Sequence, residues 1–235
     1  MSTFIFDLDG TLADSRECLM NSLNHAFHSV GLPEFNYCPV QSLQQDLAST
    51  FKSAMQDLGR PLDEELMRKF IAEFRWFHEH EGEESIRPFE GIEETLENLK
   101  KTHVLAVATT KHSPQARRVL RRIRLDRFFD HIQGTDPGMK YKPDPDILLK
   151  TLRVLEIPTR LAAYVGDGRH DMTAARRGGL LAVGAAYGFG GDSVFEPGSS
   201  DYVVYHHREL ESVREEWSQR PFVGLQAASS QVAFS

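Results

Sequence analysis

Short apolar runs alternate with amphipathic stretches along most of the chain. Continuous apolar runs are typical of strands that are buried on both faces of a parallel sheet. Such runs lie at 4–6, 104–108, 161–165, 181–185 and 202–204, with a shorter one around Ile132. In the stretches between them, apolar residues recur every three or four positions, as on the buried side of a helix. Alternating strands and helices predict a parallel sheet that is covered by helices on both faces.

A different pattern fills residues 15–87. Three amphipathic helices are predicted there, and no strand signal appears between Ala13 and Arg87. We therefore predict an α/β fold, with a doubly wound, Rossmann-like core at 1–14 and 88–217 and an inserted all-helical domain at 15–87. The tail at 218–235 has neither a helical nor a strand period and is expected to be flexible or loosely docked.

Composition and charge narrow the class of protein. The chain has 235 residues, a hydrophobic content of 40% and a net charge of -7, which argues against a basic surface for nucleic acid. No apolar run approaches the roughly 20 residues that a membrane-spanning helix needs. The two cysteines, Cys18 and Cys38, form neither a metal-type spacing nor a disulfide framework. We expect a cytoplasmic protein without nucleic-acid or membrane partners, either a monomer or a weak homodimer.

Polar side chains gather where several of the predicted strands end. In chain order the four clusters are Asp7 with Asp9, Thr109 with Thr110, Lys142, and Asp167 with Asp171. Because the carboxyl ends of parallel strands meet at one edge of a sheet, we expect these clusters to converge there. That edge would then carry four acids, a hydroxyl group and a lysine.

This set of groups is typical of phosphoryl transfer through a carboxylate nucleophile. Mg²⁺ prefers oxygen ligands and keeps several of its waters. A metal ion and a lysine both stabilise the ionised form of an attacking acid. The sequence therefore predicts that Asp7 is a nucleophile and that Mg²⁺ and Lys142 lie beside it.

The same residues resemble the motifs of the haloacid dehalogenase-like hydrolases. The segment 7–15, Asp-Leu-Asp-Gly-Thr-Leu-Ala-Asp-Ser, is similar to their first motif, Thr109 to the second and Lys142 to the third. The fourth motif is matched by Asp167 and Asp171, which are spaced as Gly-Asp-x-x-x-Asp.

The resemblance extends from Met1 to about Trp217 and is greatest to the phosphoglycolate phosphatase-like subfamily. Members of that subfamily carry a helical cap between the first and second motifs, and the block at 15–87 occupies the place of the cap. The resemblance implies a Mg²⁺-dependent phosphatase that acts on a small phosphorylated metabolite.

The resemblance also implies a role for each motif residue in a two-step reaction. Asp7 would attack phosphorus and form an aspartyl-phosphate, which splits one hard displacement into two easier ones. Asp9 would protonate the leaving alcohol and then deprotonate the attacking water. Lys142 would neutralise charge between Asp7 and the phosphate.

Other motif residues would bind the phosphate and the metal ion. Thr109 and the backbone N–H groups near Leu8 and Thr110 would hold the phosphoryl oxygens. The implied Mg²⁺ ligands are Asp7, the Asp9 carbonyl oxygen, Asp167 and Asp171, the last as a ligand or as a support for one.

Two features favour a phosphatase over its relatives on the same scaffold. At the position of Asp9, dehalogenases lack an acid and the transport ATPases carry a threonine. The stretch 17–51 contains no Lys or Arg, whereas a mutase that rebinds a bisphosphate needs a cation for the distal phosphate. Arg16, Lys52 or a residue of the main domain can still supply that cation, so a phosphomutase, a pyrophosphatase and a non-catalytic phosphometabolite-binding module remain alternatives.

Substrate specificity is expected to come from the first part of the helical block. We assign the specificity contacts to polar residues of the loop and helix at 38–52, namely Gln41, Gln44, Gln45 and Lys52. The histidines form no ligand cluster, and His78, His80, His206 and His207 are expected to be exposed to solvent.

Overall fold

The computed structural model describes residues 2–33 and 47–213, and its centre is a parallel sheet. The strands are β1 (Thr3–Phe6), β4 (Val104–Thr109), β5 (His131–Gly134), β6 (Ala162–Gly166), β7 (Leu181–Ala185) and β8 (Tyr202–Val204). Their order across the sheet is β5-β4-β1-β6-β7-β8, and every neighbouring pair is parallel. The chain builds one half of the sheet from β1 outward and then returns to build the other half. The predicted doubly wound α/β fold is therefore confirmed.

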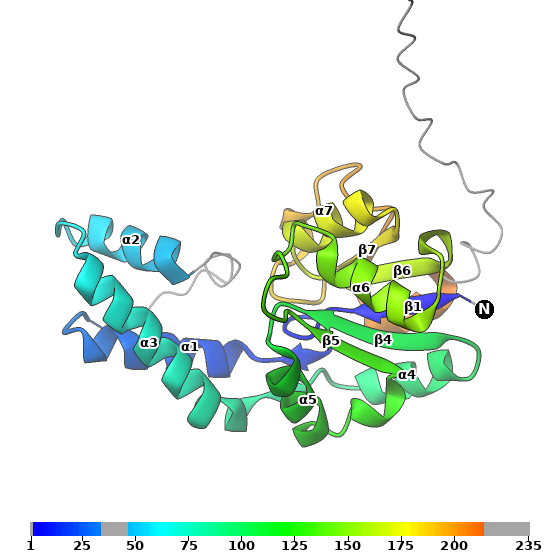
Figure 1. Cartoon of the computed structure of the whole chain (residues 1–235), viewed down its shortest axis with the longest axis horizontal. Helices are drawn as coiled ribbons and strands as arrows, with labels where there is room; N and C mark the ends of the chain where they lie inside the picture. The colour runs from blue at the N-terminus through cyan, green and yellow to red at the C-terminus, as the bar shows by residue number, and fades with distance from the viewer. Residues whose placement is uncertain (1, 34–46, 214–235) are drawn as a thin grey trace, which may run out of the picture.

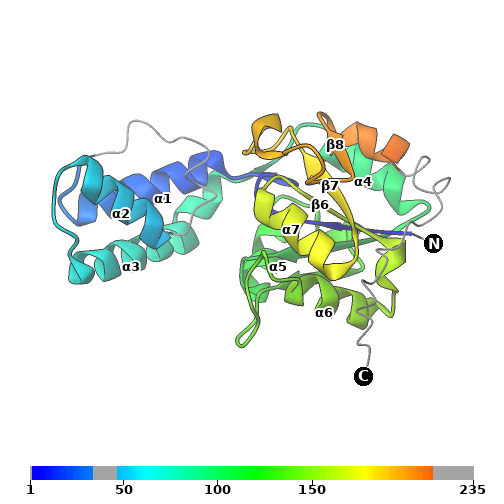
Figure 2. The same cartoon turned by 90° about the horizontal axis from the view of Figure 1, so that it is seen from above.

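Helices cover both faces of the sheet (Figure 2). They are α4 (Ile92–Lys100), α5 (Ser113–Arg122), α6 (Asp146–Leu155) and α7 (Arg169–Gly178). Alternate residues of each strand point to opposite faces. Phe4 and Phe6 of β1 thus pack with α4 and α5, whereas Ile5 packs with α6 and α7. The strands read as continuous apolar runs because both of their faces are buried.

A helical unit stands apart from the sheet (Figure 1). It contains α1 (Arg16–Ser29), α2 (Leu47–Asp57) and α3 (Glu64–His80), followed by the short 3-10 helix η2 (Gly82–Ser85). The three helices share an apolar core of their own, in which Phe27, Phe51 and Phe70 are almost completely buried. Asp63 caps α3 by accepting hydrogen bonds from the backbone N–H groups of Glu65 and Leu66.

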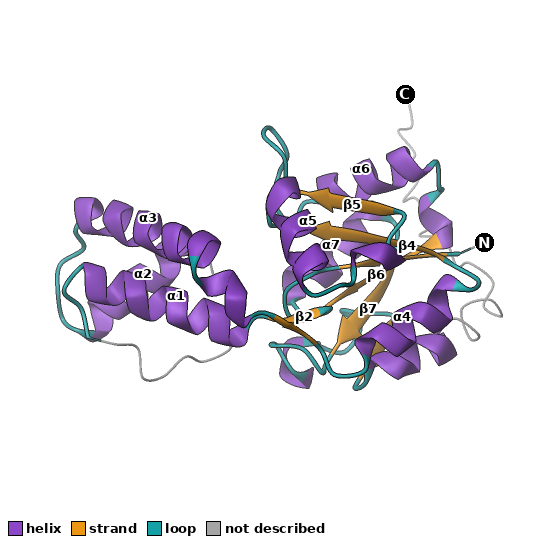
Figure 3. Cartoon of the chain, turned by 90° about the horizontal axis from the view of Figure 1, so that it is seen from below, coloured by secondary structure: helices purple, strands orange, loops and turns teal. Residues whose placement is uncertain are grey.

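Two short strands join the helical unit to the core (Figure 3). β2 (Ala13–Asp14) pairs with β3 (Arg87–Pro88) in an antiparallel sheet of two strands. The expectation that no strand lies between Ala13 and Arg87 was therefore wrong at the edges of this interval. Strands of two residues are too short to show a period of two in the sequence.

The remaining elements are short. The 3-10 helices of the core are η3 (Asp126–Phe128), η4 (Thr159–Leu161), η5 (Asp192–Val194) and η6 (His207–Glu209). Residues 210–213 continue η6 as α-helix, and the rest of the helix expected at 209–217 lies outside the described residues, as does the tail. Within the described ranges, no helix combines the length and hydropathy that crossing a membrane requires.

Candidate active site

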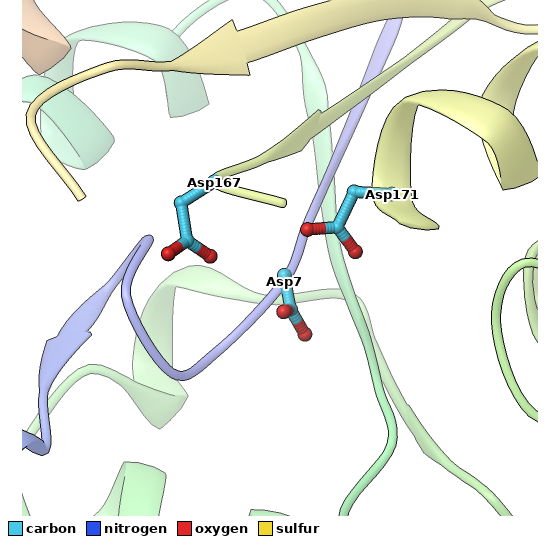
Figure 4. Close-up of side chains that lie close together, drawn as sticks. All are labelled: Asp7, Asp167 and Asp171. Atoms are coloured by element: carbon cyan, nitrogen blue, oxygen red, sulfur yellow. The ribbon is translucent and has the colours of Figure 1, made fainter. Parts of the chain in front are cut away.

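Three carboxylates converge at the carboxyl ends of the central strands (Figure 4). Asp7 follows β1, Asp167 follows β6, and Asp171 lies in the first turn of α7. One carboxylate oxygen from each lies within 4.8 Å of the other two. All three residues are buried, with exposed fractions of 6%, 5% and 0%. The adjacent parallel strands β1 and β6 bring the first two acids together, as the positions of the strand ends predict.

Lys142 supplies the positive charge within this group. Its Nζ lies 3.0 Å from Asp7 Oδ2 and 2.6 Å from Asp171 Oδ1, and it donates a third hydrogen bond to the Tyr164 hydroxyl at 3.0 Å. The Tyr164 hydroxyl in turn donates to the Ala108 carbonyl oxygen at 2.8 Å. Burial opposes the charge of Lys142, but Asp171 and Asp7 outweigh it and hold the pKa of Lys142 well above its ordinary value.

The charges of the cluster do not balance within the described residues, because one ammonium faces three carboxylates. Burial, followed by repulsion from Asp171 and Asp7, raises the pKa of Asp167 well above its ordinary value. Burial also raises the pKa of Asp7, although Lys142 opposes this. Asp7 Oδ1 is buried without a hydrogen-bond partner. An unpaired buried oxygen among excess negative charge fits a divalent cation with oxygen ligands.

Two glycines allow the loops around Asp167 to approach closely. Gly10 has a φ of 76°, and a Cβ atom there would lie 2.3 Å from Asp167 Oδ2. A Cβ atom on Gly188 would lie 2.2 Å from the Gly10 carbonyl oxygen. The same Asp167 oxygen accepts a hydrogen bond from the backbone N–H of Phe189 at 2.9 Å. The loop after β1 and the loop after β7 thus enclose Asp167 between them.

Asp9 faces different partners from the other three acids. Its Oδ1 accepts a hydrogen bond from the Ser15 hydroxyl at 2.7 Å, and its Oδ2 lies 3.0 Å from Lys111 Nζ. Burial raises the pKa of Asp9, but Lys111 and Ser15 outweigh burial, so the pKa lies below its ordinary value. Asp9 therefore stands ionised at the edge of the cluster, with 23% of its side chain exposed.

Comparison with known proteins identifies the family. The family model for haloacid dehalogenase-like hydrolases matches residues 4–185, a range that includes all the acids of the site. The chain belongs to the haloacid dehalogenase-like hydrolase family. The resemblance inferred from the motifs is confirmed, and the protein is an enzyme of the hydrolase class.

Relatives of this hydrolase are similar over nearly their whole length. Pyrophosphatase PpaX from Bacillus thuringiensis is 27% identical over 205 residues, which are 87% of this chain and 92% of that protein. The crystal structure of a predicted phosphoglycolate phosphatase from Haemophilus somnus is 25% identical with a TM-score of 0.80, and the match covers 91% of this chain and 98% of that one. A haloacid dehalogenase-like family hydrolase from Streptococcus pneumoniae, at 24% identity and a TM-score of 0.82 with the same coverage, shares the fold.

The second motif of the hydrolase lies next to the first. β4 is parallel to β1 and pairs with it, with Val107 opposite Phe6. Thr109, the last residue of β4, therefore lies at the same edge of the sheet as Asp7. Thr109 is buried, and its hydroxyl accepts a hydrogen bond from the Lys111 backbone N–H at 3.3 Å. Thr110 is exposed at the strand end, whereas the side chain of Leu8 is fully buried and leaves only its backbone to a ligand.

The expected specificity residues are only partly described. Gln41, Gln44 and Gln45 lie outside the described residues. Lys52 is exposed on α2, in the helical unit. Neither placement assigns a substrate contact.

Sequence reasoning missed Lys111, a partner of Asp9, and His78, which contacts Lys111. Lys111 was not singled out, although it lies two residues after Thr109 at the same strand end. His78 was expected to be exposed but is only 7% exposed, with its Nε2 2.9 Å from Lys111 Nζ. Burial and then the Lys111 ammonium lower the pKa of His78 to about 4. His78 lies four residues after Phe74, so it continues the apolar stripe of α3, and that spacing is the signal for its burial.

His207 corrects a second expectation of solvent exposure. It is 3% exposed in the core, where its Nδ1 lies 2.7 Å from the Thr95 hydroxyl. It links η6 to α4 through Thr95 and also lies against the Glu90 carbonyl oxygen, and no hydrogen bond or ion pair of the described residues joins it to the acids of the site.

Proposed function

We propose that this hydrolase is a Mg²⁺-dependent phosphatase that acts on a small phosphorylated metabolite through an aspartyl-phosphate. The observation that carries the proposal is the environment of Asp7. One of its oxygens contacts Lys142, and the other is buried without a partner beside Asp167 and Asp171. A carboxylate that is held beside a fixed ammonium in a buried site is suited to attack an anionic phosphate. The ammonium keeps the carboxylate ionised and offsets the repulsion between the two anions.

In the first step, the Asp7 carboxylate attacks phosphorus while the bond between phosphorus and the substrate oxygen breaks. Asp9 gives its proton to the departing alkoxide, so the product leaves as an alcohol. The negative phosphoryl group raises the proton affinity of the neighbouring Asp9 carboxylate, which favours the protonated acid that this step needs. Thr109 and the backbone at Leu8 and Thr110 orient the phosphoryl oxygens.

In the second step, a water molecule attacks the same phosphorus atom and loses its proton to Asp9. The bond between phosphorus and the Asp7 oxygen breaks, so the carboxylate is restored and inorganic phosphate leaves. One residue thus serves as acid and then as base, which requires that it reach the substrate oxygen and the water from one position. Lys142 stabilises the ionised form of Asp7 in both steps.

The residues that would hold Mg²⁺ are Asp7, Asp167 and the Asp9 carbonyl oxygen, with Asp171 as a ligand or a support. When bound, the metal ion neutralises the excess negative charge and polarises the phosphoryl group. The helical unit, at 15–87, is proposed as the cap that excludes bulk water during turnover, with Gln41, Gln44, Gln45 and Lys52 as candidate specificity contacts. The low cysteine content supports the cytoplasm as the proposed compartment.

Pyrophosphate hydrolysis is the second candidate activity. A relative that is similar over 87% of this chain is named as a pyrophosphatase, whereas a structural relative is a predicted phosphoglycolate phosphatase. The same nucleophile and metal site serve either reaction, because both transfer a phosphoryl group from an oxygen leaving group.

Phosphate release with and without Mg²⁺ tests the proposal. The substrates would be p-nitrophenyl phosphate, 2-phosphoglycolate, sugar phosphates, nucleotides and pyrophosphate. We expect Mg²⁺-dependent release by the wild type, its loss in Asp7→Asn, and normal release by Asp57→Asn, which changes an exposed acid of α2. Activity that survives Asp7→Asn would contradict the mechanism, and a preference for pyrophosphate would favour the second candidate.

A further inference from the structure

A buried chain of polar contacts runs from Asp9 into the helical unit. Lys111 Nζ lies between Asp9 Oδ2, at 3.0 Å, and His78 Nε2, at 2.9 Å. Lys111 belongs to the loop between β4 and α5, whereas His78 lies near the end of α3 that faces the core (Figure 1). Only 8% of the Lys111 side chain and 7% of His78 are exposed.

The contacts fix the hydrogen-bonding state of His78. An ammonium group only donates hydrogen bonds, so His78 Nε2 must accept from Lys111 and the ring proton must sit on Nδ1. His78 Nδ1 lies 3.2 Å from Cys18 Sγ and 3.5 Å from the Ser22 hydroxyl, both on α1. The imidazole is thereby held by both α1 and α3, and it presents a lone pair to Lys111.

We propose that Lys111 and His78 are positioning residues for Asp9, which link this acid of the core to the helical unit. The inference rests on the proposed function, because it concerns the proton transfers assigned to Asp9. A carboxylate with a single fixed partner can still rotate about its χ2 torsion. Ser15 on one oxygen and Lys111 on the other remove that freedom, and His78 directs the ammonium toward Asp9.

A second contact between the helical unit and the core provides a matched control. Glu83 of η2 accepts hydrogen bonds from Arg118 of α5 at 2.8 and 2.9 Å. Among the described residues, Arg118 forms its side-chain hydrogen bonds and ion pairs with Glu83 and Glu79, not with Asp9, Lys111 or His78. Arg118→Met therefore weakens the junction while the contacts among Asp9, Lys111 and His78 stay in place.

Leaving-group dependence separates positioning of an acid from a structural role. p-Nitrophenolate leaves without a proton, whereas the more basic phenolate needs one, so loss of a correctly placed acid penalises phenyl phosphate more. The experiment measures kcat/KM for both aryl phosphates with Mg²⁺ in wild type, Lys111→Met, His78→Leu, His78→Gln and Arg118→Met. Thermal unfolding of each variant checks that it folds.

We expect the ratio of kcat/KM for p-nitrophenyl phosphate over phenyl phosphate to rise about tenfold in Lys111→Met. This is less than the ~10²–10⁴-fold that general acid catalysis contributes, because Asp9 itself is still present. His78→Leu should raise the ratio by a smaller factor. His78→Gln should restore it, since an amide oxygen also accepts from Lys111. Arg118→Met should leave the ratio unchanged.

Lys111→Met should also produce a burst of p-nitrophenol. With p-nitrophenyl phosphate as the substrate, phosphorylation of Asp7 needs no proton donor. Hydrolysis of the aspartyl-phosphate still needs Asp9 as a base, so the second step becomes slower than the first.

Equal losses for both substrates in Lys111→Met, with no burst, would overturn the positioning role. An unchanged ratio in His78→Leu would overturn the link to the helical unit. A wild type that hydrolyses neither aryl phosphate would overturn the proposed function and this inference with it.

Discussion

Lys142 Nζ lies 3.0 Å from Asp7 Oδ2 in a site where neither side chain is more than 8% exposed. The same nitrogen lies 2.6 Å from Asp171 Oδ1, so one ammonium compensates two acids from opposite halves of the sheet. Removing one member of a buried ion pair leaves an uncompensated charge, which costs more than the pair contributes. Lys142 is therefore expected to matter for stability as well as for catalysis.

Lys142→Met should lower both the activity and the free energy of unfolding. We expect kcat to fall by about 10²–10³-fold, as when one preorganised electrostatic contact is removed. The free energy of unfolding at neutral pH should fall by about 3 kcal/mol, as for a broken buried pair. Urea denaturation and phosphate release measure the two effects. Lys150→Met is the control, because Lys150 pairs with Asp136 at the surface and should cost less than about 1 kcal/mol.

Asp167→Asn should make the metal-free protein more stable and remove its response to Mg²⁺. The amide removes one of three repelling charges and can still accept the hydrogen bond from Phe189. In the wild type, Mg²⁺ at 100 times its Kd should add about 2.7 kcal/mol to the free energy of unfolding. Thermal unfolding in EDTA and in Mg²⁺ tests this, and an undiminished response in Asp167→Asn would exclude the carboxylate as a ligand.

The stability advantage of Asp167→Asn over the wild type should grow as the pH rises. In the metal-free wild type, the folded state holds a proton on Asp167 above the ordinary pKa of 3.8, whereas the unfolded state has lost it. The folded state then binds more protons, so its stability falls as the pH rises through this window. Asp9 and Asp171 have lowered pKa values and contribute with the opposite sign, but both proteins share them.

The difference in free energy of unfolding should therefore increase above about pH 4, by up to about 1.4 kcal/mol per pH unit, and level off above the folded pKa. Urea denaturation in EDTA across this range measures it. A difference that stays constant or shrinks would show that Asp167 is not held protonated by its neighbours.

The local hydrophobic pattern predicted the strands and helices of the protein well, because each of these elements buries a defined face. The run 104–108 is apolar throughout since both faces of β4 are covered, and α3 shows its stripe because Phe70 and Phe74 face one apolar core. The convergence of Asp7 with Asp167 followed from the rule that parallel strands end at one edge. The order of the strands did not follow, because pairing between distant segments leaves no local period.

The sequence did not predict the side chains that act through contact with another side chain. Tyr164 lies inside the apolar run 161–165, where the pattern predicts only a buried strand, yet its hydroxyl bridges Lys142 and Ala108. Lys111 and His78 are 33 residues apart in the chain, and the local pattern around either residue does not indicate that the two are in contact. Such contacts depend on how the helical unit docks, which periodicity does not describe.

Tyr164→Phe should reduce turnover without disturbing the fold. The ring stays buried, but Lys142 loses a hydrogen-bond partner and the Ala108 carbonyl loses its donor. We expect kcat to fall by about tenfold, and the free energy of unfolding by about 1–2 kcal/mol, as for other buried hydrogen bonds. Thr151→Val removes a buried hydroxyl that donates only to the Ile147 carbonyl oxygen of its own helix, α6, and should cost stability without lowering kcat. Equal kcat values for Tyr164→Phe and the wild type would contradict the role of the hydroxyl.

Gly10→Ala should abolish Mg²⁺ binding and activity, whereas Gly31→Ala should not. Both glycines have a positive φ, of 76° and 68°, so alanine pays a similar backbone penalty of about 1 kcal/mol at each. Only at Gly10 does the new Cβ meet another group, 2.3 Å from Asp167 Oδ2, whereas nothing lies within 4 Å at Gly31. All three atoms of the Asp167 carboxylate would lie within 2.7 Å of the new Cβ, so we expect the carboxylate to leave its position in Gly10→Ala. Mg²⁺-dependent thermal shifts and phosphate release compare the two variants, and equal behaviour would mean that the loop after β1 yields without moving the carboxylate.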